Sequence, residues 1–556
     1  MMLCVAASLA AALTTRISSA QSRGSSPANQ PRPKLAVILM VDQMRGDYVE
    51  RFKGDWSKGL KRLVTQGAWF RNAAYPYLNT VTCAGHATVS TGALPHVHGI
   101  VANTWWERKE NRLTTCTEDP ASPDVTYGPP AAGGESAARL VVPTFTDEMR
   151  NQRHAHVVTL SLKARSAIML AGHGADAVVW LNDALNGWAT SATYSKSPVP
   201  AVKTFVDANP IAADYGKTWN RILSPSQYHD ADDLEAEAPP RGWTRMFPHV
   251  LAGTAGAADA FFYHQWETSP YADAYLGRFA AALAESFQLG KHDGTDVLAV
   301  SFSSTDIVGH QFGPDSQEVQ DMYAHLDQTI GALLDRLDAL VGRDQYVVTL
   351  TADHGVTAIP EQAMKRSLNA GRLTASAIVD PAEKRAQAAA GAGKYIASLV
   401  GNDLYFEPGM YQKLESNPGA LDAVIETIAA TPGIAKVFRS SELRNATNGT
   451  DPLLRAAALS YYEGRSGDLV IALKPGWMFG VGGTTHGSAN HDDQYVPVLF
   501  MGRGVKPGQY TQAVTPADVA PTLAALCGIA LSHGEGHALF GDAEHLSKTA
   551  SAGSRH

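Results

Sequence analysis

The feature that most restricts how this chain can fold is a series of continuous apolar runs of strand length, with acidic, histidine or lysine residues at or near one end. The clearest run, 346–352, is followed at once by Asp353 and His354. The full set of runs is 34–41, 156–162, 296–302, 346–352 and 496–501. A continuous rather than alternating apolar pattern is typical of strands that are buried on both faces.

Helical patterns separate these runs. They occur around 59–66, 145–151 and 317–341, and the last carries apolar residues from Val319 to Leu337 at helical spacing. The alternation of strand, helix and strand predicts an α/β fold class, with a doubly wound, mostly parallel sheet and helices on both faces. Ligands bind at the carboxyl ends of the strands in such sheets, where most of the acidic and histidine residues fall.

Two stretches interrupt the alternation, at about 185–290 and 360–480. The first is rich in Trp, Tyr, Pro and Asp and has no clear period, whereas the second contains helical patterns at 386–399 and 421–430. Specificity elements often lie on irregular segments that a rigid scaffold holds in place. We therefore expect both stretches to be insertions that cap the active face.

The two ends of the chain have the composition of segments outside a folded domain. Residues 1–20 combine an apolar core with small residues before position 21, as in a secretory signal peptide, although the usual basic start is missing. Residues 21–33 are a polar, proline-rich tether. The expected catalytic domain spans 34–540, and 541–556 form a C-terminal tail.

Export and charge limit the expected partners. No other apolar run is long enough to span a bilayer, so we expect a soluble protein that is periplasmic or secreted. An oxidising compartment permits a disulfide between Cys83 and Cys116, which the sequence does not establish. The net charge of −8 argues against a nucleic-acid-binding role, which requires a basic face. A small-molecule partner and a monomeric chain are expected.

Thr82 lies where an extended run gives way to small residues that are suited to the start of a helix. The free N–H groups at such a start can bind an anion close to the threonine oxygen. Thr and Ser are also ordinary helix-capping residues, so this stretch alone does not predict chemistry.

Six potential metal ligands stand at or near the ends of the apolar runs. They are Asp42, Asp306, His310, Asp353, His354 and His486. The spacing of Asp306 and His310 places both on one side of a helix. Each ligand taken singly is more often a cap or a surface residue, but their joint placement favours metal. Mixed carboxylate and imidazole ligation suits zinc, and two ions roughly 3.5–4 Å apart can clamp the attacking and leaving oxygens of a phosphoryl displacement.

Taken together, these motifs resemble the alkaline phosphatase superfamily. The residues that carry the resemblance are Val41-Asp42, Thr82 to His86, Gly99 to Asn103, Thr305 to His310, Ala352 to Gly355 and Thr485 to Ser488. The pair Lys163 and Arg165 after a strand is similar to the phosphate-irrepressible alkaline phosphatases of bacteria, which use threonine as nucleophile. The resemblance covers about 34–530.

The resemblance implies two zinc ions per chain and a residue-by-residue assignment. Asp306, His310 and His486 would hold one ion. Asp42, Asp353 and His354 would hold the other together with the Thr82 oxygen. Thr82 would attack phosphorus and form a phosphothreonine that water hydrolyses. Asn103, Lys163 and Arg165 would contact the remaining phosphoryl oxygens.

Lys163 and Arg165 also bear on the substrate class. A phosphate monoester carries an extra charged oxygen where a diester carries a neutral group, so cations at that place favour monoesters. The alternative is that both residues are solvated at a strand end.

Four other functions fit these residues less well. The nucleotide pyrophosphatase and phosphodiesterase branch shares the zinc ligands, threonine and asparagine but is not expected to carry the Lys-x-Arg pair. A sulfatase is disfavoured because 83–87 lack the expected Pro and Arg, and a mutase because it usually has a serine nucleophile. A catalytically dead zinc-binding protein would have no need of Thr82.

Overall fold

The computed structural model describes residues 32–130, 133–182, 184–254 and 256–540. The predicted signal segment at 1–20, the tether up to residue 31 and the tail at 541–556 lie outside the described residues. Among the residues described, there is no helix with the length and apolarity needed to cross a membrane.

The fold is built on an 11-stranded sheet, which we call the main sheet. Its strands, in spatial order, are β21 (Gly508–Val514), β2 (Ala68–Ala73), β20 (Val498–Gly502), β13 (Tyr346–Thr351), β1 (Leu35–Val41), β12 (Asp296–Phe302), β7 (Val157–Ser161), β8 (Ala177–Leu181), β9 (Trp188–Ser191), β5 (Glu118–Thr126) and β6 (Gly134–Glu135).

The centre of this sheet is parallel, because β13, β1, β12, β7 and β8 run side by side in the same direction. Antiparallel pairs begin at both flanks, where β20 pairs with β13 and β9 pairs with β8. All five predicted apolar runs are strands of this sheet, and the α/β fold class is confirmed.

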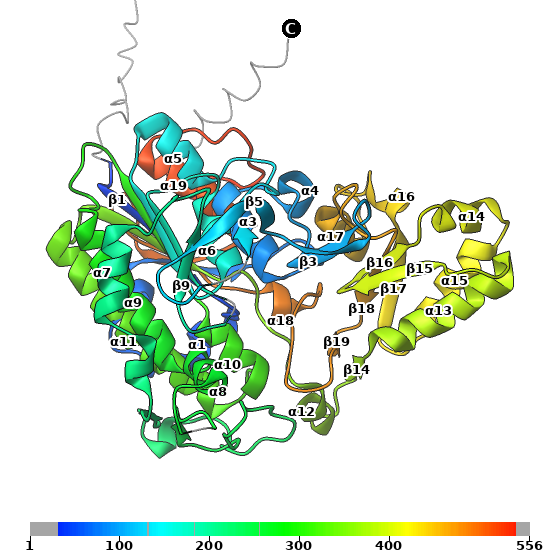
Figure 1. Cartoon of the computed structure of the whole chain (residues 1–556), viewed down its shortest axis with the longest axis horizontal. Coiled ribbons are helices and arrows are strands. Elements are labelled where there is room, and N and C mark those ends of the chain that lie inside the picture. The colour runs from blue at the N-terminus through cyan, green and yellow to red at the C-terminus, as the bar shows by residue number, and fades with distance from the viewer. Residues whose placement is uncertain (1–31, 131–132, 183, 255, 541–556) are drawn as a thin grey trace, which may run out of the picture. The chain divides into compact units, whose positions relative to one another are not determined.

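Helices cover both faces of the sheet (Figure 1). One face carries α1 (Asp47–Phe52), α2 (Gly59–Gln66), α9 (Pro270–Ser286) and α11 (Gln317–Leu340). The other carries α3 (Thr82–Thr91), α5 (Phe145–Arg153), α6 (Ala164–Ala171) and α19 (Val519–Cys527). The predicted helices at 59–66, 145–151 and 317–341 correspond to α2, α5 and α11.

Strand β1 shows why two helical layers are needed. Its residues at odd positions, from Leu35 to Val41, belong to one apolar core, and those at even positions, from Ala36 to Met40, belong to the other. Side chains alternate between the faces of a strand, so a run without polar positions must be covered on both sides. Each fully buried aliphatic side chain contributes roughly 1.5–3 kcal/mol.

The stretch at 360–480 contains a second, four-stranded sheet, which we call the inserted sheet. Its strands, in spatial order, are β15 (Ile396–Val400), β16 (Asp403–Phe406), β18 (Leu469–Leu473) and β17 (Ile434–Arg439). Helices α13 (Ala375–Ala390), α14 (Met410–Ser416) and α15 (Ala420–Ala429) share a separate apolar core with it. The other elements of this stretch are α12 (Pro360–Lys365), β14 (Gly371–Leu373), α16 (Ser440–Leu443), α17 (Pro452–Ser460) and β19 (Trp477–Phe479).

The predicted helix at 386–399 is correct only for 386–390, which end α13, and wrong for the rest, whereas that at 421–430 is confirmed as α15. Helix α13 ends at Ala390 because the next residue, Gly391, has φ of 91°, and 396–400 form strand β15.

The stretch at 185–290 is only partly irregular. Strand β9 belongs to the main sheet, and α9 packs on β12 and β7. Between them lie α7 (Pro200–Ala208), α8 (Ala260–Glu267) and a short pair of strands, β10 (Thr218–Trp219) and β11 (His249–Val250). The boundaries of both insertions and of the catalytic domain remain predictions.

A disulfide joins Cys83 in α3 to Cys116, and both residues are fully buried. Cys116 directly follows a hairpin formed by β3 (Thr104–Glu107) and β4 (Arg112–Thr115). The pairing that the sequence left open is therefore present. It ties the start of α3 to the segment that follows Asn103.

Candidate active site

Thr82 is the first residue of α3 and is buried. The preceding residue, Val81, is extended, so the chain turns into the helix at the threonine. Gly85, one turn later, allows α3 to pack against the end of β13, because a Cβ atom at this position would collide with the backbone oxygen of Asp353. The small residues after Thr82 thus bring the helix start against the carboxyl end of a central strand.

The other predicted site residues follow adjacent central strands. Asp42 follows β1, Lys163 lies between β7 and α6, and Asp353 and His354 follow β13. Asp306 and His310 lie on α10 (Ser304–Phe312), which follows β12. Because the carboxyl ends of parallel strands meet at one edge of a sheet, residues that are far apart in sequence come together here.

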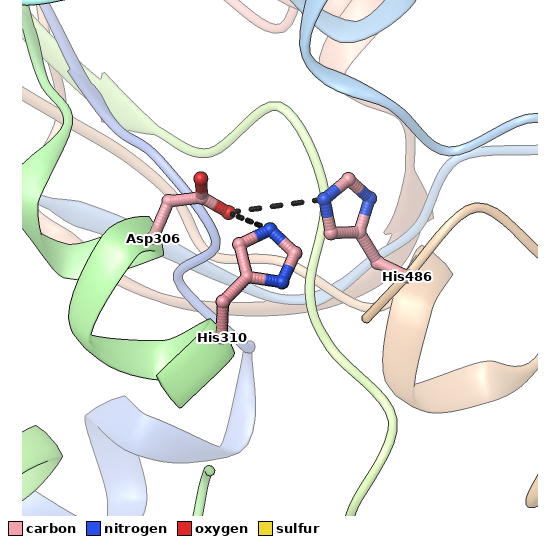
Figure 2. A group of neighbouring side chains, drawn as sticks. All are labelled: Asp306, His310 and His486. Carbon is pink, nitrogen blue, oxygen red and sulfur yellow. Dashed lines mark ion pairs between the residues drawn. The ribbon is translucent and has the colours of Figure 1, made fainter. Parts of the chain in front are cut away.

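Asp306, His310 and His486 form one group of possible metal ligands, shown in Figure 2. Oδ1 of Asp306 lies 3.1 Å from Nε2 of His310 and 3.8 Å from Nε2 of His486. His486 comes from the loop between β19 and α18 (His491–Gln494). The ligand atoms of the three side chains lie within 4.8 Å of one another.

Asp42 and His354 form a second group with Asp306. Nε2 of His354 lies 3.5 Å from Oδ1 of Asp42 and 3.5 Å from Oδ2 of Asp353. These three atoms are buried and have no hydrogen-bond partner within the described part of the chain. Buried polar atoms without partners are costly, and their convergence fits a bound cation. The predicted ligand Asp353 therefore borders this group, and Asp306 lies between the two groups.

The three histidines are oriented in the same way. Nδ1 of each ring donates to a backbone oxygen. His310 donates to Thr484 at 2.8 Å and His486 to Thr80 at 2.8 Å. His354 donates to Gly355 at 2.9 Å. A carbonyl oxygen accepts only, so Nδ1 carries the proton and Nε2 keeps its lone pair for a metal. Burial, followed by the charges of His354 and His310, lowers the pKa of His486 well below its usual value, which favours the neutral, metal-binding form.

Negative charge accumulates at this edge of the sheet. Burial and the neighbouring carboxylates of Asp306 and Asp353 raise the pKa of Asp42 well above its usual value. The ammonium of Lys163 lies 2.6 Å from Asp42 Oδ2 and 2.5 Å from Asp306 Oδ2. One ammonium does not balance three buried carboxylates, so the donor set and its charge both fit metal cations. Lys163 is not a solvated residue at a strand end.

Asn103 and Arg165 present donors that no other described residue accepts from. Oδ1 of Asn103 accepts a hydrogen bond from the backbone N–H of Cys83 at 2.8 Å, which fixes the amide and leaves its N–H groups available. Nε of Arg165 is buried and has no hydrogen-bond partner among the residues described. Both arrangements suit an anionic ligand.

Gln43 was missed by the sequence reasoning. Its Nε2 donates to Asp306 Oδ1 at 2.6 Å, and its backbone N–H donates to Asp353 Oδ1 at 3.1 Å. Its φ of 66° is unusual for a residue other than glycine, and such strain often occurs at functional sites. The only sequence signal is its position next to Asp42.

A cavity of about 280 Å³ opens beside the site. Asn103 and His486 are among the residues that line it. Residues of the stretch at 360–480 line it as well, among them Asn402, Trp477 and Phe479. This stretch therefore borders the site.

Comparisons with known proteins agree with this geometry. The family described as type I phosphodiesterase / nucleotide pyrophosphatase matches residues 36–493. Alkaline phosphatase PafA of Elizabethkingia meningoseptica is 32% identical over 91% of this chain and 93% of its own length. Alkaline phosphatase PhoV of Synechococcus elongatus is 31% identical over 90% of this chain and 91% of its own.

The crystal structure of wild-type PafA superposes with a TM-score of 0.83 at 30% identity, covering 91% of this chain and 98% of that one. A second structure of PafA, with the same TM-score, carries substitutions of a threonine, an asparagine, a lysine and an arginine, in that chain order. The resemblance inferred from the motifs is confirmed. The chain belongs to the type I phosphodiesterase / nucleotide pyrophosphatase family and, within it, to the alkaline phosphatases.

Proposed function

We propose that this alkaline phosphatase hydrolyses phosphate monoesters through a phosphothreonine on Thr82, with the help of two zinc ions. The observation that carries the proposal is the convergence of two groups of carboxylate and imidazole atoms at the edge of the sheet against which the start of α3 packs. Asp306, His310 and His486 would hold one ion, and Asp42, Asp353 and His354 would hold the other. The mixed oxygen and nitrogen donors suit zinc.

When bound, the two ions would supply Lewis-acid stabilisation of the negative charge on the attacking and departing oxygens. Thr82 Oγ1, after loss of its proton, forms a bond to phosphorus while the bond from phosphorus to the ester oxygen breaks, and the departing alkoxide takes up a proton from water and leaves as the alcohol. Water then cleaves the phosphothreonine and restores the Thr82 hydroxyl. The products of the cycle are an alcohol and inorganic phosphate.

The remaining phosphoryl oxygens would be held by Asn103, Lys163 and Arg165. The amide of Asn103 is fixed by its bond to Cys83, and Lys163 already lies between Asp42 and Asp306. The two cations can neutralise the extra charged oxygen of a monoester. A diester carries a neutral organic group in that place. Support comes from the PafA variant, in which a threonine, an asparagine, a lysine and an arginine were changed, the same residue types in the same chain order as Thr82, Asn103, Lys163 and Arg165.

A phosphodiesterase is the second candidate, because the matching family takes its description from this activity. The two functions are distinguished by the rates on an aryl phosphate monoester and on the matching diester at equal concentration. We expect the monoester to react faster. A faster diester would contradict the proposed function.

We also propose that the protein is exported and is either periplasmic or secreted. The disulfide between Cys83 and Cys116 supports this, because such bonds persist in oxidising compartments. The N-terminal sequence supports it as well. Fractionation of cells that produce the full chain, with N-terminal sequencing of the mature protein, tests the proposal.

A further inference from the structure

A turn of the inserted sheet lines the cavity beside the candidate site. Val400 of β15 pairs with Asp403 of β16, so only Gly401 and Asn402 form the connection. Gly401 has φ of 55°, which glycine adopts without strain and which suits the first position of a two-residue hairpin turn. The backbone N–H of Ile471 donates a hydrogen bond to the backbone oxygen of Asn402 at 2.8 Å, which holds the turn to the inserted sheet. Gly401 is exposed, whereas the next residue, Asn402, is only 6% exposed.

The side chain of Asn402 joins two segments of the site. Its Nδ2 donates to Oδ1 of Asn79 at 2.8 Å and to the backbone oxygen of Gly487 at 2.6 Å. Asn79 lies three residues before Thr82, and Gly487 directly follows His486. Both hydrogens of the amide are therefore used, one on each segment.

Asn79 extends the connection to a third segment. Its Nδ2 lies 3.2 Å from the backbone oxygen of Val101, two residues before Asn103, and 3.2 Å from Oδ2 of Asp403. Asp403 is buried, and its Oδ1 accepts a bond from the Gly467 N–H at 2.6 Å. The segments that carry Thr82, Asn103 and His486 thus meet around one pair of asparagines.

We propose that Asn402 is a positioning residue of the active site, which aligns Thr82, Asn103 and His486 through Asn79 and Gly487. The inference rests on the proposed function. Asn402 lacks an acid, base or nucleophilic group, so its effect passes through the residues that it holds. Small displacements of reacting groups are costly in catalysis, up to about 100-fold for 1 Å.

Contacts other than those of Asn402 also attach the inserted sheet to the rest of the fold. Leu78 packs in an apolar cluster with Phe438 and Val470. Arg108 binds Asp468 at 3.0 Å. Loss of Asn402 should therefore disturb alignment without detaching the segment.

The test compares Asn402→Ala with a matched control, Asn417→Ala. Asn417 also lies in the inserted segment and donates through Nδ2 to a backbone oxygen, that of Ala389, at 2.9 Å, but it is not among the residues that line the site cavity. For N402A we expect a fall in kcat of about tenfold or more on an aryl phosphate monoester. N417A should keep the wild-type kcat, and the Tm values of the two variants should be similar.

A double variant sharpens the test. If Asn402 acts in part through Asn79, then N402A should reduce kcat by a smaller factor in the N79A background than in the wild type, because the bond to Asn79 is already lost there and only the bond to Gly487 remains to be removed. Independent, multiplying effects would overturn the proposal, as would a wild-type kcat in N402A. N402S, which keeps one donor, serves for the comparison if N402A does not accumulate as folded protein.

The Thr82→Ala variant is measured in parallel. Normal turnover of T82A would refute the proposed function itself. An inactive T82A together with a fully active N402A would refute only the positioning role.

Discussion

Two regions contribute to the site in different ways: the carboxyl ends of the central strands of the main sheet, and the inserted sheet. At the edge of the main sheet, carboxylates and imidazoles from adjacent strands converge, and each histidine is oriented by a backbone oxygen. The inserted sheet has its own apolar core and contributes a polar turn and the wall of a cavity. Under the proposed function, the scaffold supplies the chemistry, whereas the insertion supplies alignment and part of the cavity beside the site.

Removal of metal should cause the largest loss of activity, because it acts on the ligand groups of the main sheet. The scaffold carries two groups of candidate ligands, so we expect incubation with a chelator to reduce activity to the background rate and zinc to restore it. Elemental analysis of the untreated protein should find two zinc ions per chain. Full activity in protein shown to be free of metal would contradict the ligand assignment.

Thr82→Ala should lose at least about 10³-fold in kcat, because no other hydroxyl takes the place of the nucleophile. The variant should keep its zinc, since the carboxylates and imidazoles remain. Steady-state rates and metal content are measured on the same preparation. A normal rate would show that phosphorus is attacked by another group.

Lys163→Ala combined with Arg165→Ala should slow monoester hydrolysis by about 10²–10³-fold, the range found when groups that stabilise transition-state charge are removed. Hydrolysis of the matching diester should change much less, because it lacks the charged oxygen that these cations meet. The ratio of the two kcat/KM values is the measured quantity. An equal loss on both substrates would mean that the pair serves the metal site, where Lys163 contacts Asp42 and Asp306.

Trp477→Ala, in the inserted segment, should have the smallest effect. Trp477 lines the cavity beside Asn103 and His486, and loss of about 1 kcal/mol of apolar contact would raise KM for an aryl monoester about fivefold. We expect kcat to stay near the wild-type value. Trp477→Phe, which keeps an aromatic ring, is the control. A fall in kcat as large as that expected for the scaffold variants would erase the distinction between the two regions.

Local patterns account for the parts of the fold that were predicted correctly. The run at 346–352 and the spacing of Val319 to Leu337 predict β13 and α11, because burial on two faces or on one stripe leaves a periodic record in the sequence. The helix predicted at 386–399 failed beyond Ala390, where Gly391 ends α13 and the chain returns as β15. Apolar periodicity over a short window does not distinguish these outcomes.

The candidate site likewise contains residues that a local pattern predicted and residues that no local pattern marks. Asp306 and His310 were recognised from their spacing, and both lie on α10 as expected. Gln43 and Asn402 were not recognised, because their roles depend on partners 263 and 323 residues away in the chain. No local pattern marks an amide that will donate to a carboxylate or to a second amide after folding.

The residue types of the site follow from the sequence alone: a threonine before small residues, a lysine and an arginine after a strand, and acidic and histidine residues at the ends of apolar runs. Only the folded chain decides which of their atoms meet. It places Asp306 between two ligand groups, turns the Nε2 atoms toward them, and brings the Gly401-Asn402 turn between the loops of Thr82 and His486. Composition and periodicity record burial, which each segment expresses by itself, whereas alignment depends on hydrogen bonds between segments hundreds of residues apart.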